Sequence, residues 1–300
     1  MQIEFARSAR STVGLEWEVA IVDRNTGELA SVADRVLQVL DERSEGGHHP
    51  TITSELLTNT VELVSGVHER VAGAVADLEG QLAEVRAVID ELGEYELVCS
   101  GSHPFSQWYD QHLTDKPRYH KLIERTRWWG RNMMIWGIHV HVGIEERDKA
   151  LPILDGLLAY IPHLQALSAS SPFWAGVETG YASNRALMFQ QLPTAGLPYP
   201  LADWSAYERY VDDLVRTGVI EDHTEVRWDI RDDLRVHAVA GRAPLVLADV
   251  PGLQHRERLA AVEPLAHPLD EALHEGADRG DLVRGRHAVA DPHLERAPTR

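Results

Sequence analysis

The stretch Thr12-Val13-Gly14-Leu15-Glu16-Trp17-Glu18-Val19 decides the fold, because apolar and acidic residues alternate along it. This alternation is typical of a β-strand with one buried face and one polar face. In such a strand Glu16 and Glu18 point to the same side. Two neighbouring carboxylates repel each other unless water or a cation compensates them. The stretch therefore predicts a strand over residues 12–23 that carries a candidate cation site. The alternative is an exposed acidic pair on an edge strand.

Two further segments add possible ligands to that site. Gly137-Ile138-His139-Val140-His141-Val142-Gly143 predicts a second strand, over residues 137–144, with both imidazoles on one face. Imidazole nitrogens bind metals or donate to phosphate, although a histidine on an apolar strand can also be a core residue with satisfied hydrogen bonds. The segment from Glu55 to Glu62 supplies two more carboxylates. Mg²⁺ prefers carboxylate oxygens, and waters and phosphate complete its coordination shell.

The composition is that of a globular protein, with 44% hydrophobic and 25% charged residues. No apolar run approaches the roughly 20 residues of a membrane span, and the N-terminus lacks the apolar stretch of a signal peptide. The single cysteine, Cys99, excludes an internal disulfide framework and favours a cytoplasmic location. A formal charge of −18 argues against nucleic-acid binding through a broad basic face. A nucleotide can still bind through a cation and a few arginines.

The remaining elements are predicted from periodicity and from residues that start or stop helices. The clearest helix covers residues 68–92, where apolar residues recur at steps of three and four and Gly93 follows. Other predicted helices are one that starts near Ser31, one within 117–135, one over 147–170 and one that begins with a capping box at Ser205 and ends at Gly218. Extended segments are predicted at 51–64, 95–100 and 225–230.

The composition changes after Arg231. All eight Trp, all eight Tyr and all four Phe residues precede that point. Such a shift marks a boundary between 1–231, the predicted catalytic domain, and 232–300, an atypical tail. The tail is either a helical accessory segment or a sequence that was not selected as part of the fold.

Seven segments in this order resemble the type 2 glutamate–cysteine ligases, also called carboxylate–amine ligases. They are Thr12 to Glu18, Glu55 to Glu62, Gly101-Ser102-His103-Pro104-Phe105, Gly137 to Gly143, Leu167 to Trp174, Gly180-Tyr181-Ala182-Ser183-Asn184-Arg185 and Arg227-Trp228-Asp229-Ile230-Arg231. The resemblance implies an α+β fold with a glutamine-synthetase-like antiparallel sheet and flanking helices. It also implies ATP, Mg²⁺, glutamate and an amine such as cysteine as ligands, with the glutamate side chain activated by phosphoryl transfer and ADP released.

The resemblance also implies roles for individual residues. The implied metal ligands are Glu16, Glu18, Glu55, Glu62 and His139. Arg185 and Arg231 would contact phosphate or the glutamate carboxylate, Arg185 as part of the ATP site as well. His141 and His103 would line the site, the former on the catalytic side and the latter near the nucleotide.

The chain departs from the family after Arg231. Family members continue with a strand that reads Thr-x-Glu-x-Arg, whereas here Asp232-Asp233-Leu234-Arg235 follows. We hypothesise that a shift of reading frame near codon 231 replaced the C-terminus, which would remove a strand and expose a sheet edge. An exposed edge makes a homodimer plausible.

Two other functions fit the same residues. One is a catalytically impaired family member that only binds Mg-ATP or glutamate. The other is a metal-dependent hydrolase that holds Zn²⁺ through His139, His141 and carboxylates. Metal preference separates the ligase from the hydrolase, because oxygen-rich sites favour Mg²⁺ and histidine-rich sites favour Zn²⁺. The presence or absence of the C-terminal strand separates the active ligase from the impaired member. Four glutamates against two histidines favour Mg²⁺.

Overall fold

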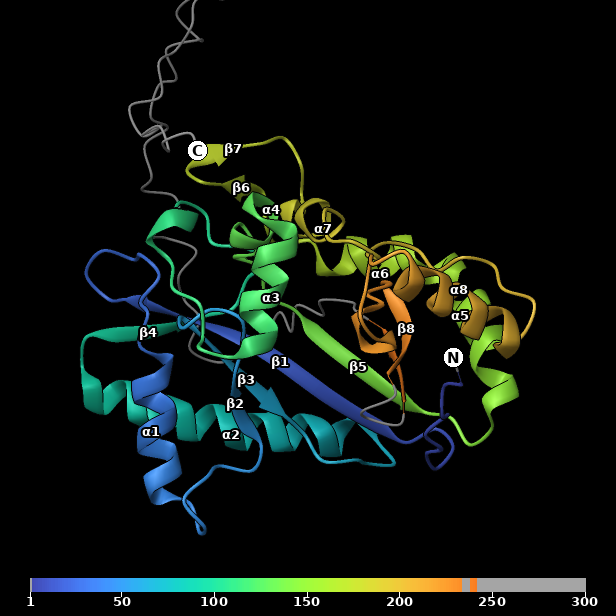
Figure 1. Ribbon diagram of the computed structural model, residues 1–300. Helices are drawn as coiled ribbons and strands as arrows, with labels where there is room; N and C mark the ends of the chain where they lie inside the picture. Colours follow the sequence, from blue (N-terminus) through green and yellow to red (C-terminus); the bar gives the residue numbers. More distant parts are fainter. Residues whose placement is uncertain (1, 234–237, 242–300) are drawn as a thin grey trace, which may run out of the picture. The chain divides into compact units, whose positions relative to one another are not determined.

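The computed structural model describes residues 2–233 and 238–241 of the chain (Figure 1). The strands are β1 (Val13–Asp23), β2 (Ile52–Ser54), β3 (Thr60–Val64), β4 (Tyr95–Val98), β5 (Ile138–Gly143), β6 (Phe173–Trp174), β7 (Val177–Glu178), β8 (Ile230–Asp233) and β9 (Ala238–Gly241). The α-helices are α1 (Ala33–Arg43), α2 (Val71–Leu92), α3 (Pro117–Thr126), α4 (Trp128–Arg131), α5 (Ala150–Leu157), α6 (Ile161–Ser168), α7 (Asn184–Phe189) and α8 (Trp204–Arg216).

Seven strands form one sheet in the order β2-β3-β1-β5-β9-β8, and β4 also pairs with β1. Every pairing in this sheet is antiparallel. The helices flank the sheet, so the architecture is α+β and the predicted fold class is confirmed. A separate hairpin joins β6 and β7.

The strand β1 is the centre of the sheet because it pairs with three other strands. Its register sets Glu16 opposite His139 on β5 and Glu18 opposite Glu62 on β3. Directly opposite residues in a sheet project to the same face. The two pairings therefore gather side chains from β1, β3 and β5 on one side of the sheet.

The other face of β1 belongs to the hydrophobic core. Leu15, Trp17, Val19 and Ile21 are all buried, as the alternation in the sequence predicts. The helices α1 and α2 cover one side of the sheet (Figure 1). Helix α2 buries Leu78, Leu82, Val85 and Ile89, and it ends at Gly93, whose φ of 76° is a left-handed cap that favours glycine.

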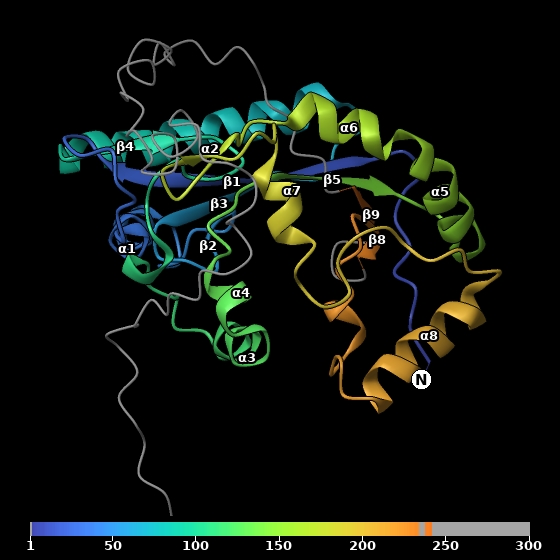
Figure 2. The same cartoon turned by 90° about the horizontal axis from the view of Figure 1, so that it is seen from above.

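The helices α3 to α8 lie on the opposite side of the sheet from α2 (Figure 1). Seen from above, α3 and α4 lie on one side of α7, and α5 and α8 lie on the other (Figure 2). Trp204 and Tyr207 of α8 pack with Trp228 and with Ile230 of β8 in a second buried cluster. This cluster fixes the segment that leads into β8.

Three predicted elements differ from the structure. The expected helix within 117–135 is broken at Arg127, whose φ of 53° ends α3 and starts α4. Helix α8 is capped by Asp203, whose carboxylate accepts from the Ala206 amide at 2.8 Å, and the capping box predicted at Ser205 does not form. The predicted strand 225–230 is wrong in its bounds, because His223–Glu225 is a 3₁₀ turn and β8 begins only at Ile230.

The sheet continues beyond Arg231. Strand β9 pairs with β5 and with β8, so β5 is not an edge in the described part of the chain. The loss of a strand was expected only as a consequence of a shifted reading frame, and that hypothesis stays a prediction. Residues 234–237 and 242–300 lie outside the described residues, and with them most of the predicted tail, 232–300.

The helical run Arg147–Ser168 differs from the expectation of no membrane-length apolar segment. It is 22 residues long and apolar enough to cross a membrane by length and composition alone. Its interior contains Pro152 and Pro162, and a 3₁₀ turn at Leu158–Tyr160 separates α5 from α6. One such run is weak evidence for a membrane span.

Candidate active site

The first cluster of the site joins β1 and β5. Oε2 of Glu16 lies 2.8 Å from Nδ1 of His139, and Oε1 of Glu16 lies 3.3 Å from Nε2 of His141. Burial by itself would raise the pKa of Glu16. The hydrogen bonds and charges of the two histidines outweigh burial and hold this pKa well below its usual range. Glu16 is therefore an anion that is available as a ligand.

The second cluster lies around Glu62 on β3. Burial, followed by the charges of Glu55, Glu16 and Glu18, raises the pKa of Glu62 well above its usual value, and Arg118 offsets only part of this effect. A buried carboxylate among other carboxylates costs free energy unless a positive charge joins it. The carboxylate of Glu18 is fixed by a backbone hydrogen bond, because its Oε2 accepts from the Gly137 amide at 2.8 Å.

Glu55 reaches the same cluster from the loop between β2 and β3. Its Oε2 accepts a hydrogen bond of 2.6 Å from the Tyr119 hydroxyl, which itself accepts from Nη2 of Arg118 at 2.5 Å. Both Arg118 and Tyr119 come from α3. Helix α3 thus meets the sheet at this carboxylate.

These residues form two groups with the spacing of cation ligands. Glu16, Glu62 and His139 place ligand atoms within 4.8 Å of one another, and Glu18, Glu55 and Glu62 do the same. Glu62 belongs to both groups. The donors are oxygen-rich, which suits hard divalent cations such as Mg²⁺, and the raised pKa of Glu62 is the electrostatic condition that a bound cation relieves. The residues present therefore fit such a cation.

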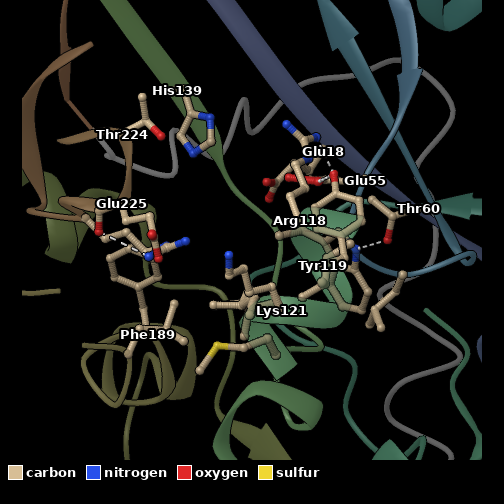
Figure 3. Close-up of a pocket in the computed structure, with 18 of the residues that line it drawn as sticks. Glu18, Glu55, Thr60, Arg118, Tyr119, Lys121, His139, Phe189, Thr224 and Glu225 are labelled. Atoms are coloured by element: carbon tan, nitrogen blue, oxygen red, sulfur yellow. Dashed lines mark hydrogen bonds between the residues drawn. The ribbon is translucent and has the colours of Figure 1, made fainter. Parts of the chain in front are cut away.

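A cavity of about 500 Å³ opens beside these groups (Figure 3). Its charged and polar walls include Glu18, Glu55, His139, Arg118 and Lys121. A hydrophobic wall made of Leu122, Met133, Phe189 and Leu192 is also present. The cavity can take a ligand with both an anionic and an apolar part.

Arg185 and Arg231, the two arginines expected to contact phosphate or carboxylate, also line this cavity. Arg185 begins the first turn of α7 and is 6% exposed. Its Nε donates to the carbonyl of Trp136 at 2.5 Å, which fixes the guanidinium. Arg231 reaches the cavity from β8.

Gly137 leaves the space that Arg185 occupies. A Cβ at residue 137 would lie 3.0 Å from Cζ of Arg185. We expect Gly137→Ala to displace the guanidinium and to lower turnover about 100-fold, because a small misplacement near the reaction is costly. Gly156→Ala is the control, since the space around Gly156 in α5 is open. Equal turnover of both variants, in preparations with the wild-type melting temperature, would contradict this assignment.

His141 and His103, the other two histidines expected at the site, are not among the described residues that line the cavity. His141 is 3% exposed and does not line the cavity in the described residues, but it contacts Glu16 and so supports a ligand. The structure does not bring His103 into the cavity. Its Nε2 bonds the carbonyl of Gly27 at 2.9 Å and its Nδ1 accepts from the Ser106 amide at 2.9 Å. The nucleotide contact expected of His103 stays a prediction, and in this structure both of its ring nitrogens bond backbone groups.

Helix α3 contributes to the cavity, which the sequence did not predict. Arg118, Tyr119 and Lys121 all line the cavity, and the only signal was the arginine-rich composition of residues 117–135. The same helix is joined to the segment before β8, because Arg125 forms ion pairs of 2.6 Å with Glu221 and with Glu225. Lys121 also pairs with Glu221. These contacts tie two walls of the cavity together.

Cys99 is not a nucleophile of this site. Burial raises the pKa of its thiol to about 12, and Arg86 offsets only part of the rise. A raised pKa keeps the thiol protonated below that pH, so at pH 8 about a thousandfold less thiolate is present than in an unfolded chain. We expect iodoacetamide to alkylate the native protein about a thousandfold more slowly than the denatured protein. If mass spectrometry shows that the native and denatured proteins are alkylated at equal rates, the raised pKa of Cys99 is contradicted.

Comparisons with known proteins agree on one family. The family model described as "Glutamate-cysteine ligase family 2(GCS2)" matches residues 12–277, so the match continues past Arg231. A protein of Leifsonia xyli subsp. xyli, provisionally named glutamate–cysteine ligase 2, is 57% identical over 272 residues, which are 91% of this chain and 70% of that protein. A protein of Paenarthrobacter aurescens, provisionally named glutamate–cysteine ligase 2-2, is 54% identical over 287 residues, 94% of this chain and 73% of that protein.

Among solved structures, a bifunctional glutathione synthetase from Pasteurella multocida has a similar fold. Its TM-score is 0.55 at 16% identity, and the likeness covers 78% of this chain and 34% of that chain. At this identity the likeness concerns the fold alone.

Proposed function

Because the chain belongs to glutamate–cysteine ligase family 2, we propose that it joins the side-chain carboxylate of glutamate to an amine such as cysteine at the expense of ATP. The observation that carries this proposal is the pair of ligand groups that share Glu62 and lie beside a cavity lined by arginines. Such a site can hold a polyanionic nucleotide next to a carboxylate substrate.

The proposed reaction has two steps. A side-chain oxygen of glutamate attacks the γ-phosphorus of ATP, which forms an acyl phosphate and releases ADP. The amine nitrogen then attacks the acyl carbon, the carbon–oxygen bond to phosphate breaks, and the nitrogen loses a proton as the amide forms. One glutamate oxygen thus ends in the inorganic phosphate.

Mg²⁺ would be held by Glu16, Glu62 and His139 and by Glu18, Glu55 and Glu62. A cation held by these residues would supply positive charge that offsets the charge of the phosphates. Glu16 remains ionised beside His139 and His141, so it is a ligand over the whole neutral range. His141 contributes by holding Glu16 rather than by contacting substrate.

Arginines that line the cavity would contact the anions. Arg185 is held by the Trp136 carbonyl and Arg231 comes from β8, and both are placed for phosphate or carboxylate oxygens. Guanidinium groups suit this task because their donors form a planar fork that matches such oxygens. Arg118 is a third candidate, and it already neutralises part of the charge around Glu62.

The alternative functions receive less support. Each ligand group in the described part of the chain contains at most one histidine, whereas a Zn²⁺ hydrolase generally uses two or more. The binding-only alternative depends on the segment after Arg231. The hypothesis of a shifted reading frame stays a prediction, and translation of the coding DNA in the other two frames tests it. A cytoplasmic location and a homodimer also belong to the proposal.

The test is ADP formation by the purified protein with Mg-ATP and glutamate, with and without a panel of amines. Amine-dependent turnover, together with transfer of ¹⁸O from labelled glutamate carboxylate to inorganic phosphate, would support the ligase and its acyl phosphate. A folded protein that binds ATP without turnover would favour the binding-only alternative. Activity that needs Zn²⁺ but no ATP would favour the hydrolase.

A further inference from the structure

Glu55 differs from the other three glutamates in how the fold holds it. Glu16, Glu18 and Glu62 lie on paired strands, so the sheet register fixes their positions. Glu55 lies in the loop between Ser54, which ends β2, and Thr60, which begins β3. The sheet register therefore does not set the direction of its carboxylate.

The segment that leads into α3 holds the backbone of this loop. The Thr114 hydroxyl donates to the carbonyl of Glu55 at 2.5 Å, and the Thr114 amide donates to the carbonyl of Leu56 at 3.0 Å. The ammonium of Lys116 donates to the carbonyl of Ser54 at 3.1 Å. Three consecutive carbonyls around Glu55 are thus fixed from one neighbouring segment.

Tyr119 completes this support at the side chain. Its hydroxyl lies between Arg118 and Glu55, with hydrogen bonds of 2.5 and 2.6 Å. The ring is 6% exposed, and Cζ of Arg118 lies 4.6 Å from its centroid. The phenol engages Oε2 of Glu55 and leaves Oε1 for a cation.

We propose that Tyr119 is a positioning residue that turns the carboxylate of Glu55 toward Glu18 and Glu62, so that this ligand group is complete only when α3 is in place. The inference rests on the proposed function in one respect, that these glutamates hold a divalent cation. Outer-shell hydrogen bonds to ligands typically contribute about 10- to 100-fold to metal affinity. The group formed by Glu16, Glu62 and His139 has no contact with Tyr119 among the described hydrogen bonds and depends on it much less.

The experiment is a titration with Mn²⁺ alone, followed by the electron paramagnetic resonance signal of free Mn²⁺. The wild-type protein should bind two ions. Tyr119→Phe removes only the hydroxyl and should weaken one site about 10-fold or more while it leaves the other unchanged. Tyr109→Phe is the matched control, because Tyr109 is 64% exposed. Melting temperatures in EDTA show that each variant is folded.

A double-mutant cycle distinguishes positioning from a general structural effect. Glu55→Gln should weaken the same site, and adding Tyr119→Phe to it should change the affinity less than twofold, because the hydroxyl then has no carboxylate to orient. Unchanged Mn²⁺ affinity in Tyr119→Phe, beside a wild type that binds two ions, would overturn this inference alone. A wild type that binds no Mn²⁺ would overturn the proposed metal site and this inference together.

Discussion

Replacement of Glu62 by glutamine is expected to remove nearly all ligase turnover and, at the same time, to stabilise the metal-free protein. Glu62 belongs to both candidate ligand groups, so its loss affects both. Removal of one charge-stabilising group from an active site typically costs about 100- to 1000-fold in rate, and a ligand shared by two groups lies at the upper end of that range.

The stabilisation follows from the pKa of Glu62. Because this pKa is raised in the folded state, the carboxylate opposes folding at pH values above its normal, unfolded pKa, and the penalty grows until the folded pKa is passed. Glutamine has no such penalty. In EDTA at pH 8 we expect a melting temperature about 3 °C above that of the wild type, which corresponds to roughly 1 kcal/mol for a domain of this size.

Excess Mg²⁺ should reverse the order of the melting temperatures. A cation at 100 times its dissociation constant adds about 2.7 kcal/mol to the wild type, whereas Glu62→Gln has lost a shared ligand. Scanning calorimetry with and without Mg²⁺ measures both effects, and Glu178→Gln on the exposed strand β7 is the control. A variant that melts below the wild type in EDTA would contradict the electrostatic account of this cluster.

Arg185→Lys is expected to lower kcat/KM about 100-fold with little loss of structure. In the guanidinium of Arg185, Nε donates to the Trp136 carbonyl while the other nitrogens of the planar fork can bind an anion. Lysine keeps the positive charge but cannot do both. The variant also leaves a buried carbonyl without its donor, which costs about 1–3 kcal/mol. Because Arg185 lies in the cavity wall, we expect KM for ATP or for glutamate to rise.

The kinetic constants identify which anion Arg185 contacts. A higher KM for ATP alone would place the nucleotide phosphates beside α7, and a higher KM for glutamate alone would place the substrate carboxylate there. Arg209→Lys serves as control, because Arg209 is exposed on α8. If both KM values and kcat stayed at wild-type levels, Arg185 would have only a structural role.

Local patterns in the sequence predicted the elements that depend on local physics. The alternation in 12–23 and the three- and four-residue steps in 68–92 correspond to β1 and α2 within a few residues. These patterns report which face of an element is buried, which is a property of neighbouring residues. The family resemblance, and no local pattern, implied that Glu16, Glu18, Glu62 and His139 belong to one site. The register of β1 with β3 and β5, which sets these side chains on one face, was found only in the structure.

The missed features depend on contacts between distant segments. Tyr119 and Lys121 line the cavity because α3 packs beside the β2–β3 loop, and no local pattern encodes that placement. The break at Arg127 requires a positive φ at a residue that usually avoids it. His103 was expected to line the site because it lies in a matching segment, but its ring nitrogens instead fix the backbone at Gly27 and Ser106.

The central position of β1 has a consequence for the synthesis of this chain. Glu16 and His139 are 123 positions apart in the sequence, although their side chains touch. At a translation rate of about 5 to 20 residues per second, roughly 6 to 25 s pass after Glu16 is made before His139 exists. During that time the ribosome-bound chain carries β1 without its β5 neighbour and an acidic cluster without its imidazole. A chaperone that shields one open strand edge would therefore act on this nascent chain before β5 is made.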